Sequence, residues 1–237
     1  MKQLTVILLF LVLSIKQLYP QYGGKRFLVN FNANYTTTAK IYLNPYSTDI
    51  DVKNRSLGVE DIFSPSIDIR YRFTDEIILG LNSEYMKSSA DADIAAIGPG
   101  GTVLVPIKEG YNSIPIEFTI FYLLPFSTEY FKFQMGGGAG YYYGSRFKEF
   151  GDASVSTVSR DFAFGIHVIT SCDFLINDFL SVRGEMKFRD PEFELRSMYE
   201  NTNVNYKGVE LRIPKKEFDS KVNVDGITFT FGVGISF

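Results

Sequence analysis

The last eleven residues, ITFTFGVGISF at positions 227–237, decide the fold of this chain. Apolar side chains stand at every odd position of this stretch, and small or polar ones stand between them. An alternation of period two is typical of a β-strand with one apolar and one polar face. The strand runs to Phe237, although the ends of soluble domains are usually polar and frayed. We therefore expect a sheet whose apolar face meets a nonpolar environment.

The other end of the chain predicts export. Lys2 precedes residues 4–15, which are almost entirely apolar. This segment is too short to cross about 30 Å of hydrocarbon as a helix. A positive residue followed by such a segment is typical of a secretory signal peptide. We expect residues 1–21 to be the signal peptide, with cleavage between positions 20 and 24, and residues 22–237 to form one domain. An uncleaved buried helix or membrane anchor is the alternative.

Composition excludes some classes of partner. The chain has 22 Phe and 15 Tyr among 237 residues, and its formal net charge is −3. Loss of residues 1–21 would remove two lysines and no acids, which leaves 22 bases against 27 acids and a net charge of −5. A nucleic-acid partner is not expected, because such proteins carry basic patches. The single cysteine, Cys172, cannot form an internal disulfide.

Period two recurs along the chain in a regular series. The short connections follow every second strand, and long connections rich in Pro, Asp, Lys and Ser follow the others. Short turns at one end and long loops at the other are typical of transmembrane β-barrels. The sequence therefore predicts an all-β fold, a closed antiparallel eight-stranded up-and-down transmembrane barrel. Its expected strands are 26–37, 65–73, 77–87, 113–124, 129–143, 160–172, 179–188 and 227–237.

The direction of the apolar face distinguishes this barrel from a soluble one. A secreted, lipocalin-like barrel would also have about eight alternating strands, with its apolar face inside. The apolar faces carry about 40 side chains, whereas an eight-stranded barrel has an interior only just wide enough for side chains to fill. An eight-stranded TIM core holds only about a dozen inward side chains. The apolar face must therefore point outward, and such a surface is stable only in lipid.

The polar face then lines the lumen. By parity, four acids and five bases point inward, and unpaired burial of each would cost several kcal/mol. We expect them to form a cross-strand salt-bridge network that fills the tube. These residues are Asp68, Arg70, Arg72, Glu84, Glu117, Lys132, Arg183, Glu185 and Lys187.

Strand count, connection lengths, signal segment and terminal aromatic together resemble the eight-stranded outer-membrane proteins of the OmpA/OmpX/OmpW type. The resemblance covers residues 25–237 and concerns architecture; only the last strand is a motif. It implies an outer-membrane location in a Gram-negative cell envelope and contact with lipid and lipopolysaccharide. It also implies recognition by the barrel-assembly machinery and an extracellular ligand bound through the long loops. The implied assembly signal is Phe229, Phe231, Val233, Ile235 and Phe237.

Candidate chemistry is sparse. Outer-membrane lipid A deacylases, which have a similar fold, use a His with a Ser two residues later on the lipid face. Here Ile169 takes the place of that Ser, and parity points His167 into the lumen. Asp49, Asp51, Asp91 and Asp93 lack the spacing of a calcium loop. We expect no catalytic residue, no metal site and no cofactor.

Three functions are compatible with the sequence. The favoured one is a non-enzymatic outer-membrane barrel with a structural or surface-interaction role through long extracellular loops. The alternative is a narrow conduit for small or hydrophobic solutes. A lipid-modifying enzyme is disfavoured because the His, Ser and acid set is missing.

Overall fold

A computed structural model describes residues 24–161, 163–214 and 216–237. The expected signal peptide, residues 1–21, lies outside them. The described part contains one helical turn, α2 (Ile50–Lys53), in which the side chain of Asp49 caps the backbone N–H groups of Asp51 and Val52. No helix in these ranges is long and apolar enough to cross a membrane.

Nearly all other elements are strands. Several of the long strands are interrupted by one to three residues, so that one path through the wall has two labels, as β3 and β4 do. The strands are β1 (Phe27–Tyr42), β2 (Ser56–Arg72), β3 (Ile77–Glu84), β4 (Met86–Gly98), β5 (Gly101–Leu123), β6 (Phe131–Glu149), β7 (Val155–Arg160), β8 (Phe164–Leu175), β9 (Leu180–Arg189), β10 (Glu192–Tyr199), β11 (Asn203–Tyr206), β12 (Val209–Arg212), β13 (Glu217–Asn223) and β14 (Ile227–Ser236).

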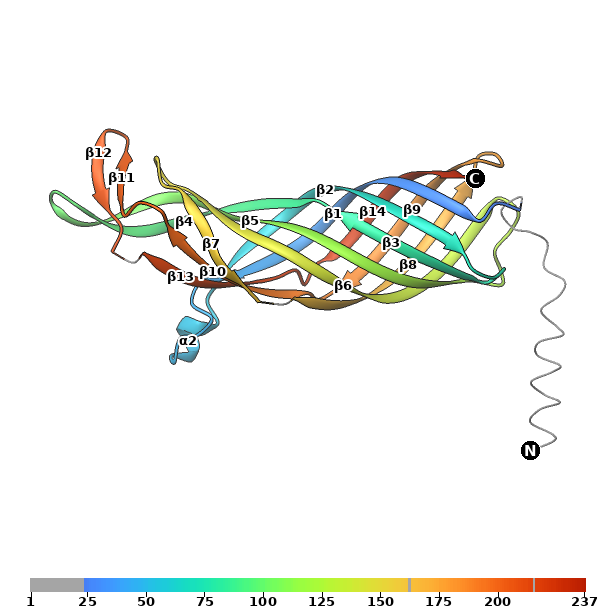
Figure 1. The fold of residues 1–237 in the computed structure, drawn as a ribbon, viewed down its shortest axis with the longest axis horizontal. Coiled ribbons are helices and arrows are strands. Elements are labelled where there is room, and N and C mark those ends of the chain that lie inside the picture. The colour runs from blue at the N-terminus through green and yellow to red at the C-terminus, as the bar shows by residue number, and fades with distance from the viewer. Residues whose placement is uncertain (1–23, 162, 215) are drawn as a thin grey trace, which may run out of the picture.

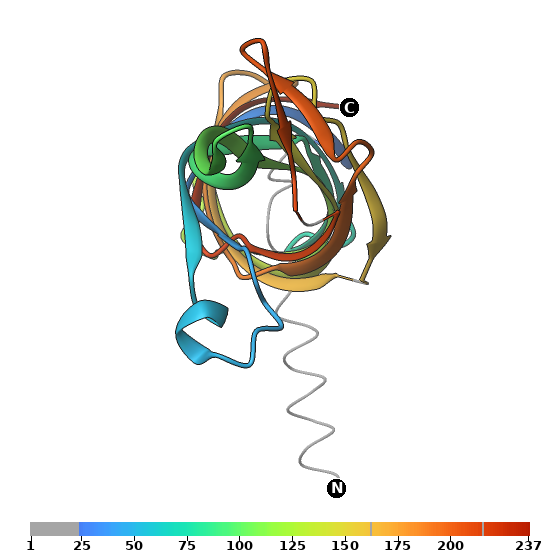
Figure 2. The same cartoon turned by 90° about the vertical axis from the view of Figure 1, so that its left-hand side faces the viewer.

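Eight of these strands close into a ring of antiparallel ladders. The order is β1, β2, β3, β5, β6, β8, β9 and β14, and β14 pairs with β1 to close the ring. Figure 2 shows the ring end-on, and Figure 1 shows the short turns gathered at one end beside the C-terminus. The predicted eight-stranded antiparallel barrel is therefore confirmed. In this fold the short turns are periplasmic and the opposite end is extracellular.

The prediction of long irregular loops is wrong for most of the residues concerned. Strand β2 begins at Ser56 and not near position 65, and all but the first two residues of β4, together with the first half of β5, lie in the connection expected between 88 and 112. The wall therefore continues as sheet well beyond the membrane, as Figure 1 shows. Two groups of strands form this extension. One contains β2, β1, β13, β10 and β7, and the other contains β6, β5, β4, β12 and β11.

The apolar side of the wall changes along the barrel. In the ring, large apolar side chains point outward, with Phe231 64% and Ile166 77% exposed. In the extension they point inward and form two packed cores, one around Ile41 and Tyr111 and the other around Ile107 and Tyr199. The outward apolar belt can be solvated only by lipid, whereas the extension has the pattern of a water-soluble sheet.

A break in one ladder accompanies the change. The pairing of β1 with β2 passes from Thr36↔Ile62 to Thr38↔Glu60, so Thr37 and Asp61 are left unpaired opposite one another, and Asp61 has a φ of 54°. The register is the same on both sides of the break, but both strands change the parity that faces inward. Asn34 is inward below the break, and Ala39 is inward above it. The outward face thus changes from apolar to polar at the level of Asp61.

Candidate functional site in the barrel lumen

The lumen at the periplasmic half of the membrane is filled by a charged cluster around Arg183. Its guanidinium is fully buried and contacts Asp173 (Nε–Oδ1 2.5 Å) and Asp68 (Nη1–Oδ1 2.7 Å). Arg70 also contacts Asp68 (Nε–Oδ1 2.7 Å) and reaches Glu185 (Nη2–Oε2 2.7 Å). Two guanidinium groups thus bind three carboxylates inside the tube. We call this set the lower cluster.

Neutral groups complete the lower cluster. Arg70 donates from Nη1 to Oε1 of Gln134 at 2.7 Å, and Gln134 donates from Nε2 to Asp173 at 2.8 Å. The Arg70 guanidinium also stacks on Phe121, with 3.7 Å between Cζ and the ring centroid. These contacts satisfy donors that would otherwise be buried without partners, a requirement for ion pairs out of contact with water.

An upper cluster lies at the extracellular half of the membrane around Glu117 and Arg189. Arg189 contacts Glu84 (Nη1–Oε2 2.8 Å) and Glu117 (Nη1–Oε1 3.3 Å), and Lys187 contacts Glu117 (Nζ–Oε2 2.5 Å). The hydroxyl of Tyr142 donates to Glu117 at 2.6 Å. These side chains come from β3, β5, β6 and β9 and so bridge opposite sides of the barrel.

All nine residues expected in the lumen have inward positions, but they do not form one network. The lower cluster contains Asp68, Arg70, Arg183 and Glu185, and the upper cluster contains Glu84, Glu117 and Lys187. Lys132 and Arg72 lie apart at the periplasmic end, where Lys132 donates to the carbonyl of Thr128 at 2.5 Å.

The sequence interpretation missed two central residues. Asp173 belongs to the lower cluster, and Arg189 belongs to the upper cluster. Each lies one residue beyond the strand ends expected at 172 and 188. Extending the alternation by one further residue would have placed both inside. A further buried ion pair, Glu109 with Arg146 at 2.6 Å, lies in the extension, in segments that were expected to be loops.

His167 and Cys172 lie on opposite faces of β8. His167 is inward, and its Nε2 lies 2.7 Å from Oγ1 of Thr119. The neighbouring Glu117 is already bound by Lys187, Arg189 and Tyr142. Cys172 faces outward and is partly buried. Among the described residues, no group of three or more His, Cys, Asp and Glu side chains is placed to hold a metal ion.

The C-terminal strand lies in the outward apolar belt. Phe229, Phe231, Val233, Ile235 and Phe237 all face outward. Phe237 exchanges two backbone hydrogen bonds with Phe27, at 2.9 and 3.1 Å, and the two rings stack at 6.0 Å. Phe237 thereby joins the end of β14 to the start of β1 at the periplasmic rim. Its role as an assembly signal stays a prediction.

The segment that carries α2 is fastened to the outside of the extension. The hydroxyl of Tyr46 donates to Glu194 on β10, and this hydrogen bond raises the pKa of Tyr46 to about 12. Beside it, Arg196 on β10 contacts Asp219 on β13 at 2.8 Å, which raises the pKa of Arg196. The outer wall around Tyr46 is thus polar and charged.

The wall has a seam between β2 and β4. β2 pairs with β3 below, but no ladder joins β2 to β4 above. The last backbone hydrogen bond between β2 and this path runs from the N–H of Tyr85 to the carbonyl of Pro65, at 3.0 Å. The reciprocal bond of this pair is missing because proline has no N–H. A shallow hollow lined by Pro65, Tyr85 and Ile114 opens outward at this point.

The fold matches solved outer-membrane proteins at low sequence identity. No protein-family model matches the sequence, and no curated protein matches it. The outer membrane protein OprG from Pseudomonas aeruginosa is 13% identical, with 90% of this chain and 96% of that chain covered and a TM-score of 0.61. The outer membrane protein AlkL, solved in lipid bilayers, is 12% identical, with 94% and 96% covered and a TM-score of 0.51. The chain therefore has the fold of the small outer-membrane β-barrels, which supports the expected outer-membrane location and contact with membrane lipid.

Proposed function

We propose that this barrel is a non-enzymatic envelope protein that is closed to solutes along its axis and acts through its extracellular extension. The filled lumen is the observation that carries the proposal. The lower and upper clusters occupy the tube at two successive levels of the membrane, and the groups at their centres, Arg183 and Glu117, are fully buried.

An axial water path would need both clusters to open. Removing one partner from a buried ion pair typically costs about 3–5 kcal/mol. Each level contains several such pairs that share members, so opening one level disturbs the whole set. Above them, the inward apolar residues of the extension form packed cores, and the ion pair of Glu109 with Arg146 is buried among them.

The extension supports a role in surface interaction. Its outer face carries ionised side chains such as Lys40, Glu194 and Arg196, and the segment around α2 enlarges that face. Sheet extensions held by apolar cores are stiff, and stiff surfaces lose less entropy on binding than mobile loops do. The partner is an extracellular molecule or a neighbouring envelope component. Lipopolysaccharide in the surrounding leaflet is one such envelope component.

Conductance in planar bilayers tests the closed lumen. We expect no steady conductance from the purified, folded barrel. A variant in which both clusters are reduced to small polar residues, D173S/R183S with E117S/R189S, provides the positive control if it keeps the mobility shift of a folded barrel on unboiled gels. Steady, ion-selective openings of the unaltered protein would overturn the proposal.

The seam between β2 and β4 favours a second candidate, a conduit for small hydrophobic solutes. Such a solute would pass sideways through the wall and would not cross the charged clusters. Uptake of a fluorescent hydrophobic dye into proteoliposomes measures this activity. If uptake exceeds that of protein-free vesicles and P65V reduces it by restoring the missing N–H donor, the conduit replaces the structural role. Equal uptake with and without protein supports the first proposal.

A further inference from the structure

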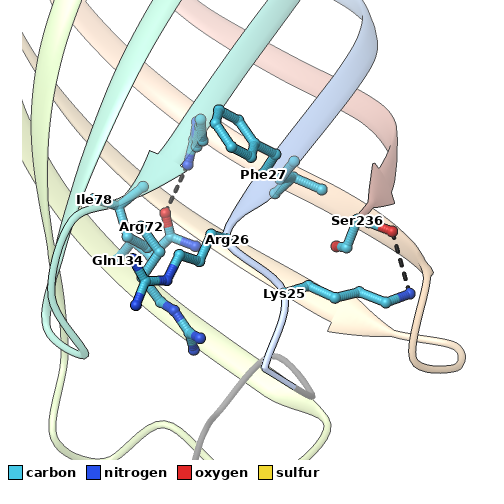
Figure 3. A pocket seen from close by; sticks show the side chains of 9 residues that line it. Lys25, Arg26, Phe27, Arg72, Ile78, Gln134 and Ser236 are labelled. Carbon is cyan, nitrogen blue, oxygen red and sulfur yellow. Dashed lines mark hydrogen bonds between the residues drawn. The ribbon is translucent and has the colours of Figure 1, made fainter.

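The periplasmic mouth of the barrel contains two arginines that face one another. Arg26 precedes β1 and Arg72 ends β2, and the N–H of Arg72 donates to the carbonyl of Arg26 at 2.8 Å. Both positions continue the inward series that contains Leu28 and Arg70. Figure 3 shows both side chains directed toward the open periplasmic end.

This arrangement is electrostatically unfavourable in the unliganded barrel. Like charges directly opposite one another on antiparallel strands are destabilising. Within the described ranges neither Arg26 nor Arg72 has an acidic partner within ion-pair distance. Nη1 of Arg72 is shielded from solvent and has no hydrogen-bond partner there. Buried donors are normally satisfied, so this one indicates a missing acceptor.

The surroundings form a small site of positive potential. A hollow of about 20 Å³, little more than the room that one water molecule needs, is lined by both arginines together with Lys25, Leu28 and Gln134. Lys25 stands at its rim, where Nζ donates to the carbonyl of Ser236 at 3.2 Å, as Figure 3 shows. Pockets that enclose small organic ligands are much larger, about 300 Å³ or more. An anion held by the two arginines would therefore lie across the mouth of the hollow, open to the periplasm.

The nearby acids are engaged elsewhere. Asp68 and Glu185, deeper in the lumen, are bound by Arg70 and Arg183. Glu76, in the turn after β2, accepts from the hydroxyl of Thr74 at 3.2 Å. The charge of the arginine pair is therefore not cancelled by the protein itself.

We propose that Arg26 and Arg72 bind a phosphate group at the periplasmic mouth, with Lys25 as an accessory cation. A planar guanidinium offers two parallel N–H donors that match the oxygens of a phosphate, and two such groups can grip one anion from both sides. The phosphate comes either from a soluble periplasmic phosphate compound or from the headgroup of a phospholipid in the inner leaflet. This inference does not depend on whether the lumen conducts.

Calorimetric titration of the folded barrel in dodecyl maltoside tests the proposal. The two probes are inorganic phosphate and dihexanoyl phosphatidylglycerol, each added at constant ionic strength. The variant R26Q/R72Q should bind at least tenfold more weakly than the unaltered protein. R26K/R72K, which keeps the charge but loses the paired donors, should lie between them. K87Q/K108Q, which loses the same charge at the extracellular end, is the matched control and should bind normally.

The two probes separate the sources of the phosphate. Binding of inorganic phosphate alone supports a soluble compound, and tighter binding of the short-chain lipid supports a headgroup. If R26Q/R72Q fails to fold, the single variant R26Q replaces it, because Arg26 is exposed and its loss leaves the lumen clusters intact. Equal affinity of R26Q/R72Q and the unaltered protein, or equal competition by chloride and phosphate, would overturn the site.

Discussion

Replacing Arg183 with Met should be among the most destabilising single changes in the membrane half of the barrel. The guanidinium makes two contacts with Asp173, at 2.5 and 2.8 Å, and one with Asp68, at 2.7 Å. In R183M, Asp68 would lose one of its two arginines and Asp173 would lose both contacts with the guanidinium. Removing one partner of a buried ion pair typically costs about 3–5 kcal/mol. Domain stabilities are typically about 5–15 kcal/mol, so the loss is a large fraction of the total.

The assay is urea unfolding of the barrel in lipid vesicles, followed by the mobility of folded and unfolded protein on unboiled gels. The matched control is R196M, which removes an arginine from an ion pair of similar length, 2.8 Å, whose side chains are 51% and 33% exposed. Exposed pairs contribute about 0–1 kcal/mol, so R196M should be nearly neutral.

A third variant separates the lost pairing from the lost packing. R183M/D173N/D68N removes the two carboxylates that contact Arg183 together with the cation, and buried pairs can be exchanged for neutral groups at little cost. It should therefore recover stability relative to R183M, with Arg70 still bound to Glu185. The reasoning is refuted if R183M is no less stable than R196M, or if the triple variant is the least stable of the set.

Two further predictions concern the extension and the packing of the wall. Hydrogen bonding to Glu194 raises the pKa of Tyr46 from 10.0 to about 12. This hydrogen bond should therefore stabilise the folded protein in full below pH 10, and the stabilisation should disappear as the pH rises through about 12. The difference in absorbance at 295 nm between the unaltered protein and Y46F should show one phenol titrating near pH 12, and titration near pH 10 would contradict the attachment. G138A should destabilise the barrel by about 1–3 kcal/mol, because a Cβ there would lie 1.9 Å from the carbonyl oxygen of Phe118. G184A, whose Cβ would meet nothing within 4 Å, should unfold in urea at or above the midpoint of the unaltered protein, and equal midpoints for both variants would contradict the close approach at position 138.

The ring of the barrel could be predicted because its signal is local. Each outward Phe or Ile is two residues from the next, so a short window such as 227–237 is enough to identify the strand and its lipid face. The same parity placed Asp68, Glu117 and Arg183 inside. Parity says which face a side chain occupies, but it does not say which residue it meets across the tube.

The pairs themselves could not be predicted because they depend on the height of each strand in the wall. Arg189 on β9 meets Glu84 on β3, on the far side of the ring, only because the strands are tilted and staggered in a particular way. That stagger is set by the ladders of all eight strands together. A window of sequence around either residue contains no information about it.

Most of the extension was missed because its alternation has the opposite meaning. In β4, Asp91 and Asp93 point outward and Ala92 between them points inward. Where only the outward apolar face is used to identify a strand, this pattern resembles a polar loop. One wall thus passes through two solvents: below the break at Asp61, burial of apolar area requires an outward apolar face, and above it an inward one. The change of face therefore locates the membrane surface on the molecule. It also explains why charged clusters fill the lumen within the membrane, whereas apolar side chains surround the Glu109–Arg146 pair in the extension: each segment places on its inside most of what its outside solvent excludes.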